Sequence, residues 1–246
     1  MLDHAALLAM PPYGLARAEK HAFLTAELTA LSCHHAERCA PYARMLAATG
    51  TALNAVTVFE QLPPLPVRLF KEFDLKSVPD EALYKTMTSS GTTGQQVSKI
   101  YLDVETSTLQ TKVLGKLVES ALGGARLPMI IVDSPSVVKN RAMFSARGAG
   151  ILGFSMFGRD RVYALTEDMQ LDIEGLQAFL AKYVQGPVFL FGFTYMVWQH
   201  FVAELKRRGE TLSIPHGVLL HGGGWKKLAA EAVSPAQFKG ALLETC

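Results

Sequence analysis

From residue 104 onward, stretches typical of α-helices alternate with short apolar stretches typical of buried β-strands. Two more helical pieces are expected after residue 221. Strands that alternate with helices of this length form a largely parallel sheet with helices on its faces, so the sequence predicts an α/β fold. The expected helices cover residues 104–122, 139–146, 173–183 and 195–208, and the expected strands cover residues 129–133, 150–154, 188–193 and 217–221.

The N-terminal part has a different composition. Residues 16–48 are rich in Ala, Leu, Glu and Arg, which favour a helix, with an interruption expected near Pro41. The segment Gln61-Leu-Pro-Pro-Leu-Pro66 ends this region and is typical of a stiff connector. We therefore expect a helical N-terminal segment of residues 1–66 and an α/β region of residues 67–246.

A run rich in hydroxyl groups and glycines, Thr88 to Lys99, lies between two expected short strands at residues 83–87 and 99–103. Gly91 and Gly94 permit positive φ and let backbone N–H groups surround an anion. The hydroxyl donors beside them are Ser89, Ser90, Thr92 and Thr93. The spacing excludes a Walker A loop, because Gln96-Val-Ser98 stands where Gly-Lys-Ser/Thr is required. The run predicts a polyphosphate-binding loop; the alternative is a Ser/Thr/Gly-rich surface loop.

Composition narrows the possible functions. The 24 basic and 22 acidic residues give a net charge of +2, and the basic clusters 206–208 and 226–227 are typical of solvated helix ends, so nucleic-acid binding is not expected. The most apolar stretch, residues 187–198, is too short to span a bilayer core of about 30 Å. The N-terminus lacks a signal-peptide pattern, and the three cysteines lack framework spacing. We expect a cytoplasmic protein.

Three smaller patterns resemble known functional motifs, but each departs from the required order or spacing. The G-x-G-x-x-G match at residues 148–153 follows an expected helix and precedes an expected strand, which reverses the dinucleotide-binding order. Residues 153–158 are one position too long for a G-x-S-x-G nucleophile elbow. Cys33, His34, His35 and Cys39 lack a second ligand pair with zinc spacing and favour an ordinary helix surface. No metal site is predicted.

A second glycine cluster follows an expected buried strand. The segment Val218-Leu-Leu-His-Gly-Gly-Gly-Trp225 ends in Gly222, Gly223 and Gly224. Ligands of parallel α/β sheets bind outside the carboxyl ends of strands, and a run without Cβ atoms lets a flat ring lie against the backbone, with Trp225 beside it. The alternative is a tight turn between strand and helix.

The glycine loop and several other segments identify a family resemblance. Ser89-Ser-Gly-Thr-Thr-Gly94 resembles the phosphate-binding motif of the adenylate-forming superfamily, whose usual lysine position holds Val97 here, with Lys99 two places later. Five further segments, spread over residues 60–240, resemble the acyl-protein synthetase (LuxE) family. They are Leu69-Phe-Lys-Glu-Phe-Asp-Leu75, Asp133-Ser-Pro135, Phe144-Ser-Ala-Arg-Gly-Ala-Gly-Ile-Leu-Gly-Phe154, Phe191-Gly-Phe-Thr-Tyr-Met-Val-Trp198 and His221-Gly-Gly-Gly-Trp-Lys-Lys227.

The resemblance implies the N-terminal part of an adenylate-forming enzyme fold and a two-step ATP-dependent, Mg²⁺-dependent reaction. A fatty acid would form an acyl-adenylate, and its acyl group would pass to a cysteine thiol, destined in luminous bacteria for an acyl-accepting reductase. The hydroxyls and amides of residues 89–94, with Lys99, would bind the phosphates. By the same resemblance Gly222, Gly223 and Gly224 would line the adenine side, while Phe191, Thr194 and Trp198 are candidates for the acyl pocket.

The resemblance also predicts what the chain lacks. The family's magnesium-binding glutamate, lid lysine and acceptor cysteine are expected beyond Cys246, so no catalytic residue is assigned and the chain looks truncated. Three hypotheses stay open: an acyl-protein synthetase, a phenylacetate-type acid ligase that uses coenzyme A, and a non-catalytic protein that binds a nucleotide or a partner.

Overall fold

The computed structural model describes residues 3–88, 96–139 and 146–246, and the chain divides into two compact units, Met1–Ser120 and Ala121–Cys246. The sequence suggested a boundary after residue 66. In the structure, later segments bond to the first helices instead. His35 Nδ1 lies 2.6 Å from Ser77 Oγ, and His4 Nδ1 lies 3.3 Å from Glu105 Oε1.

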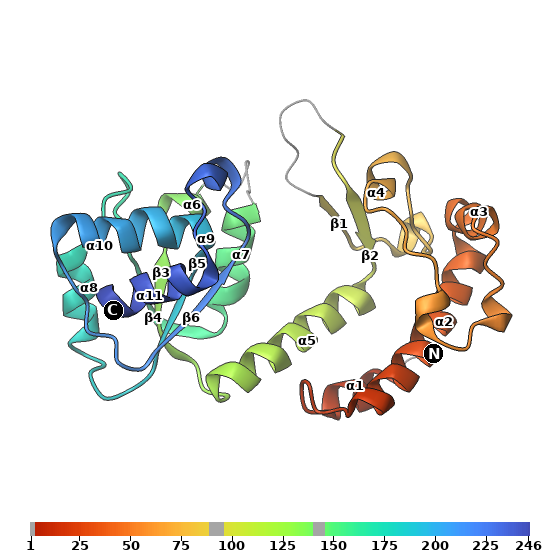
Figure 1. Ribbon diagram of the computed structural model, residues 1–246, viewed down its shortest axis with the longest axis horizontal. Coiled ribbons are helices and arrows are strands. Elements are labelled where there is room, and N and C mark those ends of the chain that lie inside the picture. The colour runs from red at the N-terminus through yellow and green to blue at the C-terminus, as the bar shows by residue number, and fades with distance from the viewer. Residues whose placement is uncertain (1–2, 89–95, 140–145) are drawn as a thin grey trace. The chain divides into compact units, whose positions relative to one another are not determined.

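The first unit is mainly helical and carries one short antiparallel hairpin (Figure 1). The helix expected over residues 16–48 is confirmed, with its break at Cys39, whose extended backbone (φ −128°, ψ 94°) separates two helices; Pro41 then lies in the first turn of the second. The elements are α1 (His4–Ala9), α2 (Arg17–Arg38), α3 (Ala40–Ala48), α4 (Leu69–Glu72), β1 (Lys85–Thr88), β2 (Lys99–Leu102) and α5 (Val104–Leu122), with 3₁₀ turns at Leu53–Ala55, Phe59–Gln61 and Asp80–Ala82.

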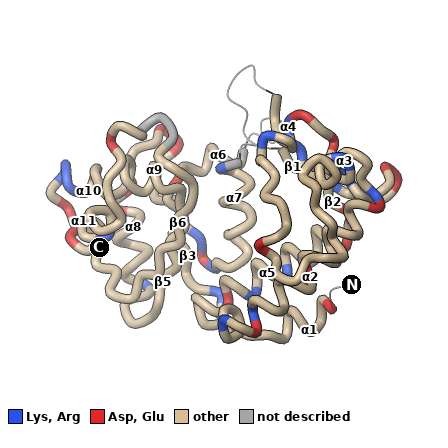
Figure 2. The backbone as a smooth tube through the Cα atoms, turned by 45° about the vertical axis from the view of Figure 1, so that its right-hand side comes forward, with Lys and Arg blue, Asp and Glu red and all other residues tan. Residues whose placement is uncertain are grey.

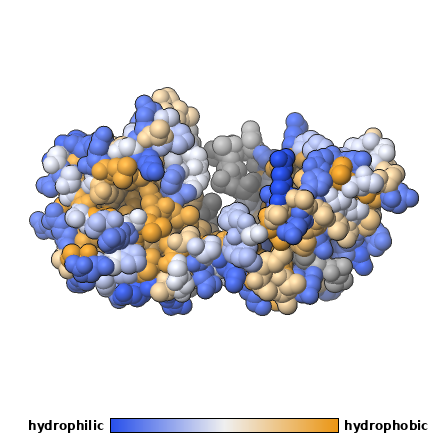
Figure 3. Space-filling view, turned by 60° about the horizontal axis from the view of Figure 1, so that its bottom comes forward, coloured by the Kyte–Doolittle hydropathy of each residue, from blue (hydrophilic) through white to orange (hydrophobic). Residues whose placement is uncertain are grey.

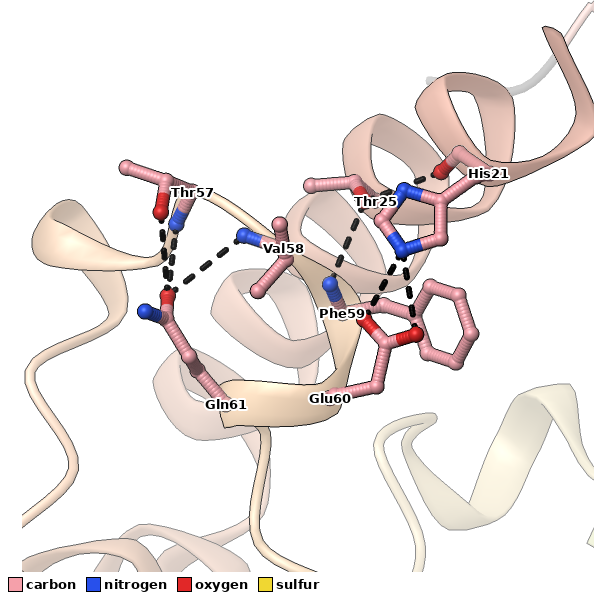
Figure 4. A network of polar contacts seen from close by, with 7 residues as sticks. All are labelled: His21, Thr25, Thr57, Val58, Phe59, Glu60 and Gln61. Carbon is pink, nitrogen blue, oxygen red and sulfur yellow. Dashed lines mark hydrogen bonds and ion pairs between the residues drawn. The ribbon is translucent and has the colours of Figure 1, made fainter. Parts of the chain in front are cut away.

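The 3₁₀ turn at Phe59–Gln61 is bound to α2 by a polar network (Figure 4). His21 Nε2 lies 3.0 Å from both carboxylate oxygens of Glu60, and the backbone N–H of Phe59 donates to Thr25 Oγ1 at 3.1 Å. The amide oxygen of Gln61 accepts from the backbone N–H of Thr57 at 2.8 Å. These bonds fix the path of the chain between the helices and the proline-rich connector.

The second unit contains a four-stranded parallel sheet with the strand order β4-β3-β5-β6, which confirms the α/β expectation. Strand β5 begins and ends where the sequence predicted. The strands are β3 (Leu127–Val132), β4 (Gly158–Tyr163), β5 (Val188–Phe193) and β6 (Gly217–Gly222).

The strand expected at residues 150–154 is wrong. These residues belong to helix α7 (Ala146–Ser155), and the strand next to β3 is β4, which begins with Gly-Arg-Asp-Arg. β4 pairs with β3 alone, and its central residues are exposed, so it needs no apolar alternation. The apolar run in α7 instead packs against the sheet: a Cβ at Gly150 would lie 3.2 Å from the Phe193 ring. The G-x-G-x-x-G match therefore lies inside a helix, where Gly150 packs closely against the sheet while a Cβ at Gly153 would meet no atom within 4 Å.

Helices cover both faces of the sheet (Figure 1). Alternate residues of β3 point to opposite faces: Ile130 and Val132 pack with α8 (Ile173–Leu180), α10 (Ala203–Arg208) and α11 (Pro235–Thr245), whereas Met129 and Ile131 pack with α7. All six residues of β3 are buried. The remaining helices of this unit are α6 (Ser136–Lys139), α8 (Ile173–Leu180), α9 (Thr194–Met196), the π-helical η5 (Val197–Val202), α10 (Ala203–Arg208), the 3₁₀ helix η6 (Lys226–Glu231) and α11 (Pro235–Thr245).

Most of the helix expected at residues 139–146 lies outside the described residues, between α6 and α7.

Basic and acidic positions are interspersed along the chain in Figure 2. Arg207 and Arg208 of the basic cluster both bond to Glu204, and Lys206 pairs with Glu244, in line with solvated helix ends. Within the described ranges, no helix has the length and apolar character that crossing a membrane requires.

Candidate functional site

The hairpin β1–β2 carries the glycine loop predicted to bind phosphates. Its strands are antiparallel, and Thr88 pairs with Lys99 at the base of the loop. The predicted phosphate-binding residues Ser89, Ser90, Gly91, Thr92, Thr93 and Gly94 lie outside the described residues. The structure does place Thr88 and Lys99, which flank the loop, next to each other in the hairpin.

Lys99, the last predicted phosphate-binding residue of this loop, points to a carboxylate. Its Nζ lies 3.3 Å from Asp74 Oδ1, and the Tyr101 hydroxyl donates to the same oxygen at 2.5 Å. The hydrogen bond and charge of Asp74 raise the pKa of Lys99. Asp74 belongs to the 69–75 segment of the family resemblance, so two of the recognised segments meet at the base of the loop.

The second glycine cluster forms a turn at the carboxyl end of β6. Gly223 has φ +77°, in the left-handed region, and a Cβ there would lie 3.0 Å from Phe193 Cδ1, so both the backbone conformation and the close contact disfavour a side chain. A Cβ at Gly222 or Gly224 would meet no atom within 4 Å. The backbone of these two residues is therefore open to a ligand, as the sequence analysis expected for a flat ring.

Thr194, at the carboxyl end of β5, holds this glycine turn. Its Oγ1 lies 2.9 Å from the carbonyl oxygen of Gly223, 3.2 Å from that of Gly222 and 3.0 Å from Nδ1 of His221. A hydroxyl has one proton, and a carbonyl can only accept, so the hydroxyl donates to a carbonyl and Nδ1–H of His221 donates to the hydroxyl. Burial lowers the pKa of His221, which favours the neutral ring with its Nε2 lone pair free to accept.

The three residues predicted to line the acyl pocket do not lie together. Phe191 is buried on the α7 side, stacked on Phe154 with ring centroids 4.4 Å apart. Trp198, in the π-helical η5, stacks on Phe238 of α11 at 5.8 Å on the opposite face. The structure therefore brings Thr194 to the glycine turn but places Phe191 and Trp198 on different sides of the sheet.

A buried ion pair lies at the carboxyl end of β3, and the sequence analysis did not assign it a role. Asp133 is 1% exposed, and its Oδ2 lies 3.0 Å from Nε of Arg147 on α7. The alignment is too poor for a hydrogen bond, so both atoms lack a hydrogen-bond partner in the described part of the chain. Arg147 also donates to the Tyr195 hydroxyl at 3.0 Å. The Asp133-Ser-Pro135 segment, at a strand's carboxyl end, was a signal that could have found Asp133 but not its partner on α7.

Burial raises the pKa of the Asp133 carboxyl, against the opposing effects of the Ser134 N–H and Arg147. A carboxyl with a raised pKa binds its proton more tightly in the folded state, so its contribution to stability falls as pH rises above about 3.8. We expect the difference in unfolding free energy between wild type and Asp133→Asn to decrease from pH 4 to pH 7, as measured by urea denaturation.

Asp160→Asn is the matched control for this pH series. The Tyr183 hydroxyl, which donates to Asp160 at 2.7 Å, lowers the pKa of that carboxyl, so stability is lost as pH falls and the corresponding difference should have the opposite slope. Asparagine also tolerates the positive φ of Asp160 (+44°). A difference for Asp133→Asn that stays constant with pH would contradict the assigned raised pKa.

A metal site is not evident among the residues that the structure describes, where no three His, Cys, Asp or Glu side chains are grouped to hold an ion. Cys39 of the weak metal pattern is buried, at 4% exposure. Comparison with protein families shows that the model of the family described as acyl-protein synthetase, LuxE, matches residues 2–246. No curated protein matches the chain.

Proposed function

Since this chain belongs to the LuxE acyl-protein synthetase family, we propose that it takes part in the ATP-dependent activation of a fatty or related carboxylic acid and its transfer to a protein thiol. The family is one of ligases. The family membership is shown, whereas the acid, the nucleotide and the thiol acceptor are what we propose.

The open glycine turn is the observation that best supports a nucleotide at this site. Gly222 and Gly224 leave space over the backbone, and Gly223 takes a conformation that side chains disfavour. The turn lies at the carboxyl ends of β5 and β6, where parallel sheets bind ligands. An adenine ring would fit against these two residues. The Thr194 hydroxyl holds the backbone of the turn in place through the carbonyl oxygens of Gly222 and Gly223.

The proposed chemistry has two steps. A carboxylate oxygen attacks the α-phosphorus of ATP, the bond to the bridging oxygen of the β-phosphate breaks, and pyrophosphate leaves. A thiolate sulfur then attacks the acyl carbon, and AMP leaves. In the first step an anion meets a polyanion, so hydroxyl and amide donors on the leaving pyrophosphate lower the barrier, and Mg²⁺ would supply further positive charge when bound.

The residues of the chain have separate roles in this proposal. The hydroxyls of Ser89, Ser90, Thr92 and Thr93 would bind pyrophosphate, and Lys99 would exchange its contact with Asp74 for a phosphate oxygen. Holding acid and nucleotide in line could itself lower the barrier by about 7–11 kcal/mol.

The test is ATP–pyrophosphate exchange by the full-length protein, measured with long-chain, short-chain and aromatic acids. We expect exchange to depend on a long-chain acid and on Mg²⁺, and the acyl group to be recovered on a protein thiol. Exchange with aromatic acids and acyl transfer to coenzyme A would replace the proposal with a coenzyme A ligase. No exchange with any acid would refute adenylation and favour a non-catalytic binding protein.

A further inference from the structure

A groove in the first unit, distant in sequence from the glycine turn, has the chemistry of a fatty-acid site. Three helices and the loop after α1 enclose a cavity of about 330 Å³, at the lower end of the usual range for small-molecule sites. Its apolar walls include Leu7 and Leu8 from α1, Phe23 and Leu24 from α2, and Val113 and Leu117 from α5.

The walls are apolar because the helices of this unit leave their apolar faces incompletely covered. No residue of α1 is buried, α2 buries only Ser32 and α5 only Val118. Leu117 is 38% exposed. Figure 3 shows hydrophobic side chains at the surface around α1. An apolar chain in the groove would remove this surface from water, which stabilises the complex.

The groove has a fixed frame. Asp3 caps α1 by accepting from the backbone N–H groups of Ala5 and Ala6 at 2.9 and 3.0 Å, and His4 pairs with Glu105 of α5. The loop after α1 closes in a turn in which Gly14 donates to the Pro11 carbonyl at 3.0 Å; a Cβ at Gly14 would lie 2.5 Å from Pro11 Cγ. The rim is therefore shaped without a ligand.

Two lysines give the groove its charge preference. Lys20 lies on the same face of α2 as Phe23 and Leu24, and Lys116 lies on the same face of α5 as Val113, because residues three and four apart are neighbours on a helix. Leu117, next to Lys116, lines the same groove. Neither lysine forms an ion pair with any residue in the described part of the chain, and no acidic side chain lines the cavity. Apolar walls with two unpaired cations fit an amphiphile with one anionic head.

We propose that this groove binds the free carboxylate form of a long-chain fatty acid, with the hydrocarbon chain between α1, α2 and α5 and the carboxylate at Lys20 and Lys116. None of the residues that line this groove belongs to the glycine turn, and the groove holds or delivers the acid without chemistry. It does not depend on the adenylation proposal, because binding here needs no nucleotide.

The first experiment maps the site on the full chain in the absence of ATP. A fatty acid with a photoreactive diazirine at its end is cross-linked to the protein, and the labelled peptides are identified by mass spectrometry. We expect labels in peptides that cover residues 7–24 and 113–117. Labels confined to residues 121–246 would overturn the groove assignment, whatever the outcome of the exchange assay.

The second experiment tests the lysines by competition of unlabelled laurate against a fluorescent fatty acid. Lys20→Gln and Lys116→Gln should each weaken binding two- to fivefold, and together about tenfold, as expected for exposed ion pairs. The matched control is Lys112→Gln, on α5 but outside the groove, which should leave affinity unchanged. Dodecanol should bind about as weakly to wild type as laurate binds to the double variant.

A third measurement separates the groove from nonspecific adsorption. Leu117→Trp adds bulk at a partly exposed wall position, so it should fill the groove and weaken binding about tenfold while circular dichroism stays unchanged. Equal laurate affinity in the wild type, the lysine double variant and Leu117→Trp would refute the proposal.

Discussion

Gly192→Val is expected to lower the free energy of unfolding of the second unit by about 3 kcal/mol or more. Gly192 lies in β5 opposite Val132 of β3, at the centre of the sheet. A Cβ there would lie 2.9 Å from Val132 Cβ and 2.9 Å from Val197 Cγ2, and both neighbours are fully buried. Packed cores resist added atoms, at about 1–3 kcal/mol for smaller insertions, and valine adds three carbons. Urea denaturation with a probe in the second unit would measure the loss.

Gly240→Ala provides the control. Gly240 lies inside α11 of the same unit, and a Cβ there would meet no atom within 4 Å. Because alanine favours a helix over glycine, this change should raise stability by about 0.5–1 kcal/mol. If Gly192→Val were as stable as wild type, the close approach of β5 to Val132 and Val197 would be wrong.

Thr194→Val is expected to reduce the use of ATP about ten- to a hundredfold, if the glycine turn binds the nucleotide. Valine has nearly the shape of threonine but cannot donate or accept. Two glycine carbonyls and His221 Nδ1 would then lose their shared partner, and each lost hydrogen bond costs about 0.5–1.5 kcal/mol. The turn would leave the conformation in which Gly222 and Gly224 are open, so the KM for ATP in pyrophosphate exchange should rise.

Thr194→Ser keeps the hydroxyl and should retain most of the activity. Nitrogen NMR of the His221 ring gives a readout that does not depend on turnover. The wild type and the serine variant should show a proton on Nδ1, whereas the valine variant should lose this preference. A valine variant with unchanged ring signals and unchanged exchange would remove Thr194 from the site.

The strands and helices with the strongest patterns could be predicted from the sequence. Helix α5 and strand β5 begin and end at the expected residues, because each is a continuous periodic or apolar run between clear breaks. Strand β4 was missed because a sheet edge tolerates the charged residues of Gly-Arg-Asp-Arg. The strand expected at residues 150–154 failed because an apolar run of that length suits a buried helix face as well.

Only the parts of the candidate site that are formed by one continuous segment could be predicted from the sequence. The glycine run shows in the sequence, and the structure adds that Gly223 needs its positive φ while Gly222 and Gly224 face open space. The contact between Asp133 and Arg147 could not be predicted, because it joins a strand end to a separate helix and depends on tertiary packing. The assignment of Thr194 to the acyl pocket stays a prediction; its place beneath the glycine turn was not foreseen.

The strand order of the second unit has a consequence for the newly made chain. Ile130 of β3 pairs with Leu190 of β5, so the centre of the sheet cannot form until the later strand exists. At a synthesis rate of about 5–20 residues per second, Leu190 leaves the ribosome roughly 3–12 s after Ile130. During that interval β3, which is buried along its whole length in the finished fold, lacks the cover of β5. Chaperone binding to nascent chains should therefore be strongest before β5 emerges.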